Sequence, residues 1–417
     1  FFETFGVSLF VARLVPVMFS ILSLWAVFEL AYHLHDGRTA LLATVFLGVM
    51  PGFFWLSTLS LLETALVFFT TASLLFFAKW LTTRQDRMLV FSGLALGLGL
   101  LTKYQMVVAA LIILLSILFL ARNQLRFALK KVTLTFVTAA LVVAPWVIIA
   151  FQVYADQILS QWLYALQVGN PERSLYSERF PIPIFYLIEM VWPYDTLHPI
   201  SLFIYIAGIA GLAFFAWRRR REDKFMLIWF LGIYVFFTLI SNKEWRYVLP
   251  LFPAIAISAS AVFFALYGRL ERSWKTQSSI SKKRLFKAAS VLLVALMVGS
   301  VAVSVYDTYD YVSKYQINID IKGATDYAFN NIGFNRSIMV LCPFNFFSRE
   351  MVRFYLWADG DNQIPVFQYP RQPVDTYTPN FNITELIQLC KERQVQFVFT
   401  YEYGGTVPYY NTTLNLQ

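Results

Sequence analysis

Charged residues are scarce in this chain: Asp, Glu, Lys and Arg together make up 14% of its 417 residues, whereas hydrophobic residues make up 58%. Soluble domains carry about a quarter charged residues, so this composition excludes an ordinary soluble domain and indicates a polytopic membrane protein. The formal net charge is +9, but the cations gather at the ends of apolar runs. That placement is typical of membrane topology signals and argues against a nucleic-acid partner.

Signals of natural chain ends are also missing. The chain opens on "FFETFGVSLF" without an initiator Met or a signal peptide, and it stops at "NTTLNLQ" without an evident closing element. We therefore expect an internal fragment of a longer protein.

Long apolar runs are plentiful up to about residue 306. A helix needs about 20 apolar residues to cross roughly 30 Å of hydrocarbon. Ten runs are predicted to span the membrane, at 9–32, 39–55, 59–80, 89–101, 105–120, 132–153, 199–217, 225–240, 248–267 and 288–306. As one helix, residues 89–120 would measure about 48 Å at 1.5 Å per residue, which is too long for the bilayer. We interpret this stretch as a tight helical hairpin with Lys103 at its turn.

The distribution of Lys and Arg assigns the two faces of this ten-span map. Twenty of the 34 cations fall in five loops on one face, which the positive-inside rule makes cytoplasmic. The opposite face of the membrane region holds six: Arg13, Lys103, Arg173, Arg179, Lys243 and Arg246. The segment "SNKEWRYVLP" (241–250) therefore places cations where they are least expected. The alternative to a functional role is an interfacial loop, anchored by its aromatic residues at the lipid headgroups.

Carboxylates on the outer face are the other candidates. The long connection at 154–198 mixes aromatic residues, prolines and acids, which favours a re-entrant or interfacial helix over a cavity; a solvated loop with ordinary surface acids is the alternative. Its acids are Asp156, Glu172, Glu178, Glu189 and Asp195. Glu63 is expected three or four residues inside an apolar helix, where a carboxylate is costly unless it faces a partner or a polar cavity. Glu29 is expected near a cytoplasmic helix end, with a structural role.

Residues 307–417 follow the last predicted span and have a different pattern. Three short apolar strands alternate with helices, which predicts a small parallel α/β domain on the extracytosolic face. Cys342 and Cys390 both lie here, and a disulfide and two free thiols are both open. The predicted fold is thus a mainly α, polytopic helical bundle in residues 1–306 with a C-terminal extracytosolic α/β domain.

Four segments, in order and on consistent sides, resemble the GT-C membrane glycosyltransferases of the protein O-mannosyltransferase and aminoarabinose-transferase group (glycosyltransferase family 39-like). They are "FFETFGVSLFVARLVPVMFSILSLWAVFELAYHL", "ATVFLGVMPGFFWLSTLSLLETALVFFTTASLLFF", "FSGLALGLGLLTKYQ" and "NKEWRYVLPLFPAIAISA". The likeness covers most of residues 1–270. It implies a GT-C-like transmembrane domain and a multi-pass protein in the plasma membrane of a prokaryote, with the endoplasmic reticulum membrane as the alternative.

The resemblance also implies a chemistry. The donor is a sugar on a polyprenyl phosphate, and the acceptor is a hydroxyl of a protein, lipid or glycan on the extracytosolic face. A carboxylate takes the acceptor proton while the hydroxyl attacks the anomeric carbon with inversion. Cations that hold the lipid phosphate stabilise the leaving group. We therefore assign donor-phosphate binding to Lys243, Arg246, Lys103 and Arg13.

The acids fit the resemblance less well. The family places its catalytic base in the first extracytosolic loop, which would lie upstream of Phe1, so we expect the base to be absent from residues 1–417. Glu63 stands where the family usually has Asp, and we assign it as a second acid or a metal contact. A divalent metal is an open possibility, but with three His residues in the chain no metal cluster is readable.

Two other classes of protein are alternatives to a glycosyltransferase. A transporter or channel usually has intramembrane charges near the midplane and repeat-related broken helices, and neither is evident in the sequence. A non-catalytic membrane scaffold with an extracytosolic binding domain is the second alternative.

Overall fold

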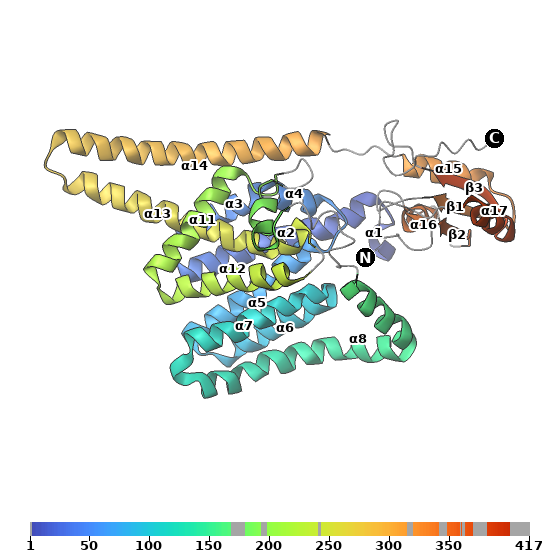
Figure 1. The fold of residues 1–417 in the computed structure, drawn as a ribbon, viewed down its shortest axis with the longest axis horizontal. Helices are drawn as coiled ribbons and strands as arrows, with labels where there is room; N and C mark the ends of the chain where they lie inside the picture. The colour runs from blue at the N-terminus through green and yellow to red at the C-terminus, as the bar shows by residue number, and fades with distance from the viewer. Residues whose placement is uncertain are drawn as a thin grey trace. The chain divides into compact units, whose positions relative to one another are not determined.

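The structure is a computed structural model that describes residues 2–167, 180–192, 198–240, 243–314, 320–341, 348–358, 360, 363–369 and 382–400. Helices dominate its membrane region (Figure 1). In chain order they are α1 Phe2–Phe5, α2 Leu9–Leu34, α3 Gly37–Val49, α4 Pro51–Thr58, α5 Glu63–Thr83, α6 Asp86–Thr102, η1 Tyr104–Met106, α7 Val107–Leu120, η2 Arg122–Gln124, α8 Leu125–Gln167, η4 Ile182–Ile184, α10 Phe185–Glu189, α11 Leu202–Arg218, α12 Arg221–Leu239, η5 Trp245–Leu251, α13 Phe252–Thr276 and α14 Ile280–Lys314.

Each of the ten predicted ranges contains helix. By length and hydropathy, five described helices are suited to cross a membrane, or six if α3 and α4 form one broken span, and Tyr104–Leu120 and Leu202–Arg218 are shorter apolar helices. The chain is thus a multi-pass membrane protein. The count of ten spans stays a prediction.

The second predicted span is not one continuous helix, and this part of the prediction is wrong. Helices α3 and α4 meet at an angle of 62°. Met50, between them, has extended backbone angles and precedes Pro51, the first residue of α4. Proline has no N–H to donate and disfavours helical angles in the residue before it, so the helix breaks there. The break leaves the carbonyl group of Val49 available to other segments.

The predicted hairpin at 89–120 is confirmed. Helix α6 ends at Thr102, and Lys103 has extended backbone angles before η1 begins at Tyr104. Figure 1 shows α6 running along α8, and the two helices pack in close contact. A Cβ atom at Gly93 would lie 2.4 Å from the carbonyl oxygen of Thr135, and one at Gly97 would lie 2.7 Å from Cβ of Val142. The glycine-rich segment is therefore a helix-packing surface, where small residues let two backbones approach.

Inner and outer helices differ sharply in burial. In the most apolar 18-residue stretch of each segment, 78% of α5 and 83% of Trp245–Thr276 is buried, against 17% of Arg122–Ala155 and 17% of the α14 segment. Helices α5 and α13 thus form the core, while α8 and α14 leave most of their apolar surface for lipid. Of the charged residues discussed below, Glu63 begins α5, and Arg246 lies in η5, directly before α13.

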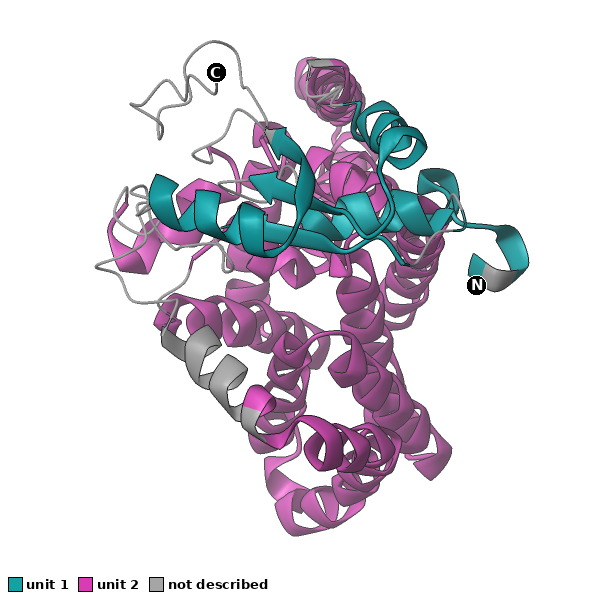
Figure 2. Cartoon of the chain, turned by 90° about the vertical axis from the view of Figure 1, so that its right-hand side faces the viewer, with its two compact units in different colours: residues 1–12, 172–174, 316–417 teal, residues 13–171, 175–315 magenta. Residues whose placement is uncertain are grey.

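The chain divides into two compact units (Figure 2): residues 1–12, 172–174 and 316–417 form one, and residues 13–171 and 175–315 form the other. The first unit carries the predicted parallel α/β arrangement, which is confirmed. Its elements are α15 Ile321–Asn331, β1 Ser337–Leu341, α16 Arg349–Ala358, β2 Val366–Tyr369, α17 Ile383–Glu392 and β3 Val395–Thr400. The strands are parallel in the order β2-β1-β3. The domain boundary at residues 306 and 307 stays a prediction; α14 itself runs to Lys314.

Only one of the two cysteines is described. Burial raises the pKa of the Cys390 thiol, on α17, above its ordinary value. Cys342 lies outside the described residues, so the disulfide question stays open.

Candidate functional site

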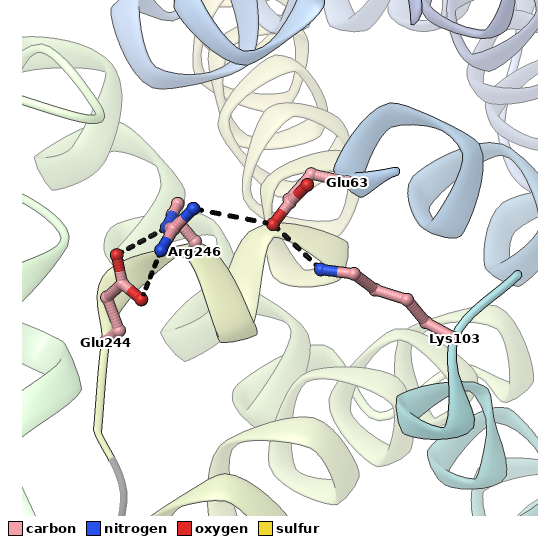
Figure 3. A network of polar contacts seen from close by, with 4 residues as sticks. All are labelled: Glu63, Lys103, Glu244 and Arg246. Atoms are coloured by element: carbon pink, nitrogen blue, oxygen red, sulfur yellow. Dashed lines mark hydrogen bonds and ion pairs between the residues drawn. The ribbon is translucent and has the colours of Figure 1, made fainter. Parts of the chain in front are cut away.

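Four charged side chains from three separate segments meet in one network (Figure 3). Nζ of Lys103 lies 2.8 Å from Oε1 of Glu63. Nη1 of Arg246 lies 3.8 Å from the same oxygen atom. On its other side Arg246 makes a two-pronged pair with Glu244: Nη2 donates to Oε2 at 2.7 Å, and Nε donates to Oε1. The structure thus brings three of the predicted site residues, Glu63, Lys103 and Arg246, into direct contact.

The backbone explains why these side chains converge. Glu63 is the first residue of α5, so the prediction that it lies a few residues inside a helix is wrong. At that position its carboxylate meets the positive end of the helix dipole, which stabilises an anion. Lys103 sits at the turn of the α6–α7 hairpin, and Arg246 is the second residue of η5. All three residues thus stand where a helix begins or ends. Their contacts bring the start of α5, the end of α6 and the start of η5 together.

Burial is uneven within the network. The side chain of Glu63 is 5% exposed, whereas those of Lys103 and Arg246 are 25% and 28% exposed. A buried carboxylate needs cationic partners to offset its desolvation, and here one oxygen atom serves two cations. Oε2 of Glu63 is buried and has no hydrogen-bond partner among the described residues. Both cations keep accessible surface with which to contact a further anion.

Lys243 has a different environment. Its residue is 3% exposed, and Nζ donates hydrogen bonds to the carbonyl oxygens of Thr238 at 2.7 Å and Ile240 at 2.5 Å. These carbonyls belong to the last turn and end of α12, where backbone acceptors lack helical partners. Burial lowers the pKa of Lys243 from its ordinary value. The amine therefore closes the end of α12, and its contact with the donor phosphate stays a prediction.

Arg13 is the fourth predicted phosphate ligand. It lies on α2 and is exposed, and it makes no ion pair with any residue in the described ranges. The structure does not bring it into the network of Figure 3. Its assignment also stays a prediction.

The sequence analysis missed the role of the η4–α10 segment, at the end of the long connection. The hydroxyl of Tyr205 donates to the carbonyl of Leu187 at 2.8 Å, and that of Tyr234 donates to the carbonyl of Pro183 at 2.5 Å. Tyr186 is fully buried on α10 beside Glu244 and Tyr247, and burial raises the pKa of its phenol above the ordinary value. Because these contacts join distant parts of the chain, no local pattern in the sequence reports them.

Of the predicted acids in this connection, the structure describes only some. Glu189 is 5% exposed and lies at the end of α10. Glu172, Glu178 and Asp195 lie outside the described residues, and of Asp156 only the backbone is described. Among the described residues, no group of three His, Cys, Asp or Glu side chains is arranged to hold a metal ion.

A second set of charges lies at the opposite end of α5. Nζ of Lys79 lies 2.9 Å from Oε2 of Glu29, with side chains 29% and 31% exposed. This pair borders an open hollow of about 660 Å³ that also involves His35 and Asp36. In a neighbouring pair, Arg218 donates from Nη2 and Nε to the fully buried Asp223 at 2.5 and 2.8 Å. Glu29 is thus paired with Lys79, and its structural role stays a prediction.

Three comparisons with known proteins bear on this arrangement. Residues 1–149 match the family described as dolichyl-phosphate-mannose-protein mannosyltransferase. A curated relative, the undecaprenyl phosphate-alpha-4-amino-4-deoxy-L-arabinose arabinosyl transferase 2 of Proteus mirabilis, is 27% identical over 262 residues, which cover 61% of this chain and 45% of the relative. The chain spans about half the length of the curated relatives it matches.

Solved structures share the fold. ArnT from Cupriavidus metallidurans in the apo state superposes with a TM-score of 0.62 at 14% identity, covering 94% of this chain and 76% of ArnT. The same protein bound to undecaprenyl phosphate gives a TM-score of 0.57 at 16% identity, covering 95% and 77%. The archaeal oligosaccharyltransferase AglB from Archaeoglobus fulgidus, in complex with an inhibitory peptide and a dolichol-phosphate, gives 0.56 at 15% identity, covering 93% and 58%. These findings confirm the resemblance drawn from the four sequence segments.

Proposed function

We propose that this chain, a multi-pass membrane protein with the fold of the GT-C glycosyltransferases, belongs to an enzyme that transfers a sugar from a polyprenyl phosphate. The acceptor is a hydroxyl group on the extracytosolic face, and the anomeric carbon is inverted. The curated relatives are named for an undecaprenyl-phosphate-linked aminoarabinose, and one ArnT structure contains undecaprenyl phosphate, which supports a lipid phosphate as the carrier.

The observation that carries this proposal is the convergence of Lys103 and Arg246 on the buried carboxylate of Glu63. The two cations come from different helices and are each about a quarter exposed. Lys103 provides a point charge, while the planar guanidinium of Arg246 suits two-pronged contact with phosphate oxygens. A lipid phosphate that approaches along the membrane surface meets both cations at the ends of core helices.

The chemistry assigns these groups a role in leaving-group stabilisation. When the bond between the sugar and the phosphate breaks, negative charge develops on the phosphate. Fixed cations stabilise that charge more than the ground state and so lower the barrier. Glu63 keeps the two cations close together without donor, because a carboxylate between them offsets their repulsion. In this proposal Glu63 organises the cation pair and does not accept the proton of the acceptor.

The proton acceptor stays a prediction. A general base must lie within about 3 Å of the acceptor hydroxyl, directly or through one water. Both carboxylate oxygens of Glu244 already accept hydrogen bonds from Arg246, which argues against Glu244 in this role. We propose that the base is an Asp or Glu upstream of Phe1, as the resemblance implies, and that the site lies in the plasma membrane of a bacterium.

A transfer assay tests the function. Full-length protein is reconstituted in lipid vesicles with a radiolabelled polyprenyl-phosphate sugar, and label that moves to acceptor is counted. Arg246→Ala removes a charge-assisted phosphate contact worth on the order of 1.5–3 kcal/mol, so turnover falls about 10- to 100-fold. Arg246→Lys keeps the charge but loses the two-pronged geometry, so its turnover is expected to lie between those of the wild type and of Arg246→Ala.

The rival functions give other results. A transporter moves the intact lipid-linked sugar across the vesicle membrane without cleavage of the phosphate–sugar bond, and a scaffold leaves the label where it was. Full activity in a folded Arg246→Ala protein would assign "NKEWRY" to an interfacial anchor.

A further inference from the structure

Helix α14 exposes most of its apolar surface, but one stripe on it is polar and buried. Ser304 and Thr308 are buried, and with Asp307 and Tyr311 they recur at the three- and four-residue spacing of one helix face. Ser304 Oγ donates to the carbonyl oxygen of Val49 at 2.6 Å, and Thr308 Oγ1 lies 3.4 Å from the same atom. This is the carbonyl left available by the break between α3 and α4.

A second contact reinforces this attachment. Oγ of Ser201, just before α11, lies 2.8 Å from Oγ of Ser304 and 3.1 Å from Oδ2 of Asp307. The backbone N–H of Gly52, at the start of α4, donates to the carbonyl of Pro199 at 2.9 Å. The short helix α4 is therefore tied to α14 at one side and to the segment before α11 at the other.

Helix α4 in turn encloses Trp245, the residue before Arg246. The ring centroids of Trp55 and Trp245 are 6.1 Å apart, and Tyr311 meets the Trp55 ring edge to face at 5.4 Å. A Cβ atom at Gly52 would lie 2.8 Å from Cζ3 of Trp245 and 3.0 Å from Cα of Pro199. Real Cβ atoms do not come that close to other heavy atoms, so any side chain at position 52 must displace Trp245 or the backbone of Pro199.

We propose that Gly52 and Trp55, held by the polar stripe of α14, are positioning residues for Arg246. They fix the indole of Trp245, which is 6% exposed, and so set where η5 begins. The guanidinium of the next residue then lies between Glu63 and Glu244, as in Figure 3. This inference rests on the proposed function, because it assigns these residues an effect on binding of the donor phosphate.

The chain supplies a matched control for Gly52. A Cβ atom at Gly48, on α3, would lie 3.6 Å from Cδ2 of Leu24, an ordinary van der Waals contact. Gly52→Ala and Gly48→Ala are thus the same chemical change on neighbouring helices, and both replace a helical glycine by a better helix former. Only the first is expected to move Trp245.

The experiment measures the dissociation constant for polyprenyl phosphate with full-length protein in nanodiscs. Gly52→Ala raises it about tenfold, and Gly48→Ala leaves it unchanged. Adding Trp245→Phe to Gly52→Ala, which gives the new methyl group room, restores most of the affinity. In an Arg246→Ala background, Gly52→Ala has no further effect, because the residue it positions is gone. Trp55→Phe is a milder change and is expected to cause a smaller loss of affinity for polyprenyl phosphate. It replaces Gly52→Ala as the test if Gly52→Ala does not fold.

Each contrary result has its own meaning. If the wild-type protein binds polyprenyl phosphate no better than the uncharged polyprenol, the proposed function fails and this inference with it. If the wild type prefers the phosphate but Gly52→Ala behaves like Gly48→Ala, or if its loss is the same with and without Arg246, the positioning role is overturned while the proposed function stands.

Discussion

Helix α5 carries an ion pair at each end, and the two pairs are built differently. At its start, one buried carboxylate, Glu63, serves two cations from two other segments. Towards its end, Lys79 makes a one-to-one pair with Glu29, and both side chains are about 30% exposed. In a one-to-one pair of similarly exposed side chains, the cation and the carboxylate neutralise each other. Glu244 also engages Arg246, but the side chains of Lys103 and Arg246 stay 25% and 28% exposed, and this surface is what a donor phosphate would contact.

The sides on which the pairs lie strengthen this contrast. Lys79 falls on the face predicted to be cytoplasmic, where the positive-inside rule already accounts for cations. Lys103 and Arg246 fall on the opposite face, where that rule gives no reason for them. In the proposed function, the same residue types thus act as topology signals at one end of the bundle and as phosphate ligands at the other.

The largest expected effect comes from removing one cation at each end of the bundle and comparing the rates of sugar transfer. Lys103→Ala removes a cation from the proposed phosphate site and lowers sugar transfer at least tenfold, because a charge-assisted contact is worth about 1.5–3 kcal/mol. Lys79→Ala removes a cation from the same helix bundle and leaves transfer unchanged in equally well-folded protein. Initial rates of both variants in the vesicle assay check this. Equal losses in the two variants would erase the distinction between the ends.

Stability gives the second contrast. Glu63→Gln leaves two neighbouring cations without their shared, buried carboxylate, and we expect it to destabilise the protein by about 1–3 kcal/mol. Glu29→Gln breaks a more exposed pair, which is worth at most about 1 kcal/mol. Thermal unfolding in detergent at one pH compares the two. A larger loss for Glu29→Gln would contradict the burial argument.

The smallest effect is a pH dependence that arises at the end of the bundle predicted to be cytoplasmic. Burial, and then the positive charge of Arg218, lowers the pKa of His35 to about 4. The unfolded chain takes up this proton near the ordinary value of about 6.5, so the unfolded state binds more protons between pH 6.5 and 4. Stability therefore falls as the pH drops through that window, by roughly 1 kcal/mol or less between pH 7 and 6.

His35→Phe tests this dependence. Phenylalanine keeps a flat ring against Phe215, which stacks on His35 with centroids 5.6 Å apart, but it does not titrate. The variant is expected to lose part of the pH dependence of its unfolding temperature between pH 7 and 5. An unchanged pH profile would show that His35 is not the group responsible.

Much of the fold could be predicted from the sequence because its signals are local. Apolar runs located ten helical ranges, and the length of 89–120 together with charge bias placed Lys103 at a turn. The strand–helix alternation after residue 320 predicted the parallel sheet. The sequence did not predict the break at Pro51, although proline is a local signal. The apolar run continues through Pro51 and has the length of a membrane span.

The site was predictable only in part. Glu63, Lys103 and Arg246 stood out because each charge opposes its apolar or cation-poor surroundings. Their convergence on one oxygen atom is a tertiary fact that residue types cannot report. Lys243 looked like Arg246 in sequence, yet its amine is bound by carbonyls at the end of α12. Tyr186 and Trp55 carried no signal, because their importance comes from residues far away in the chain.

Phosphate preference tests the central claim most directly. The affinity for polyprenyl phosphate and for uncharged polyprenol is measured in nanodiscs for the wild type, Lys103→Ala, Arg246→Ala and the double variant. We expect the wild type to bind the phosphate at least about 100-fold more tightly, each single variant to lose about tenfold or more, and the double variant to bind both lipids alike. A double variant that keeps the wild-type preference would contradict the account, because the phosphate would then be held elsewhere.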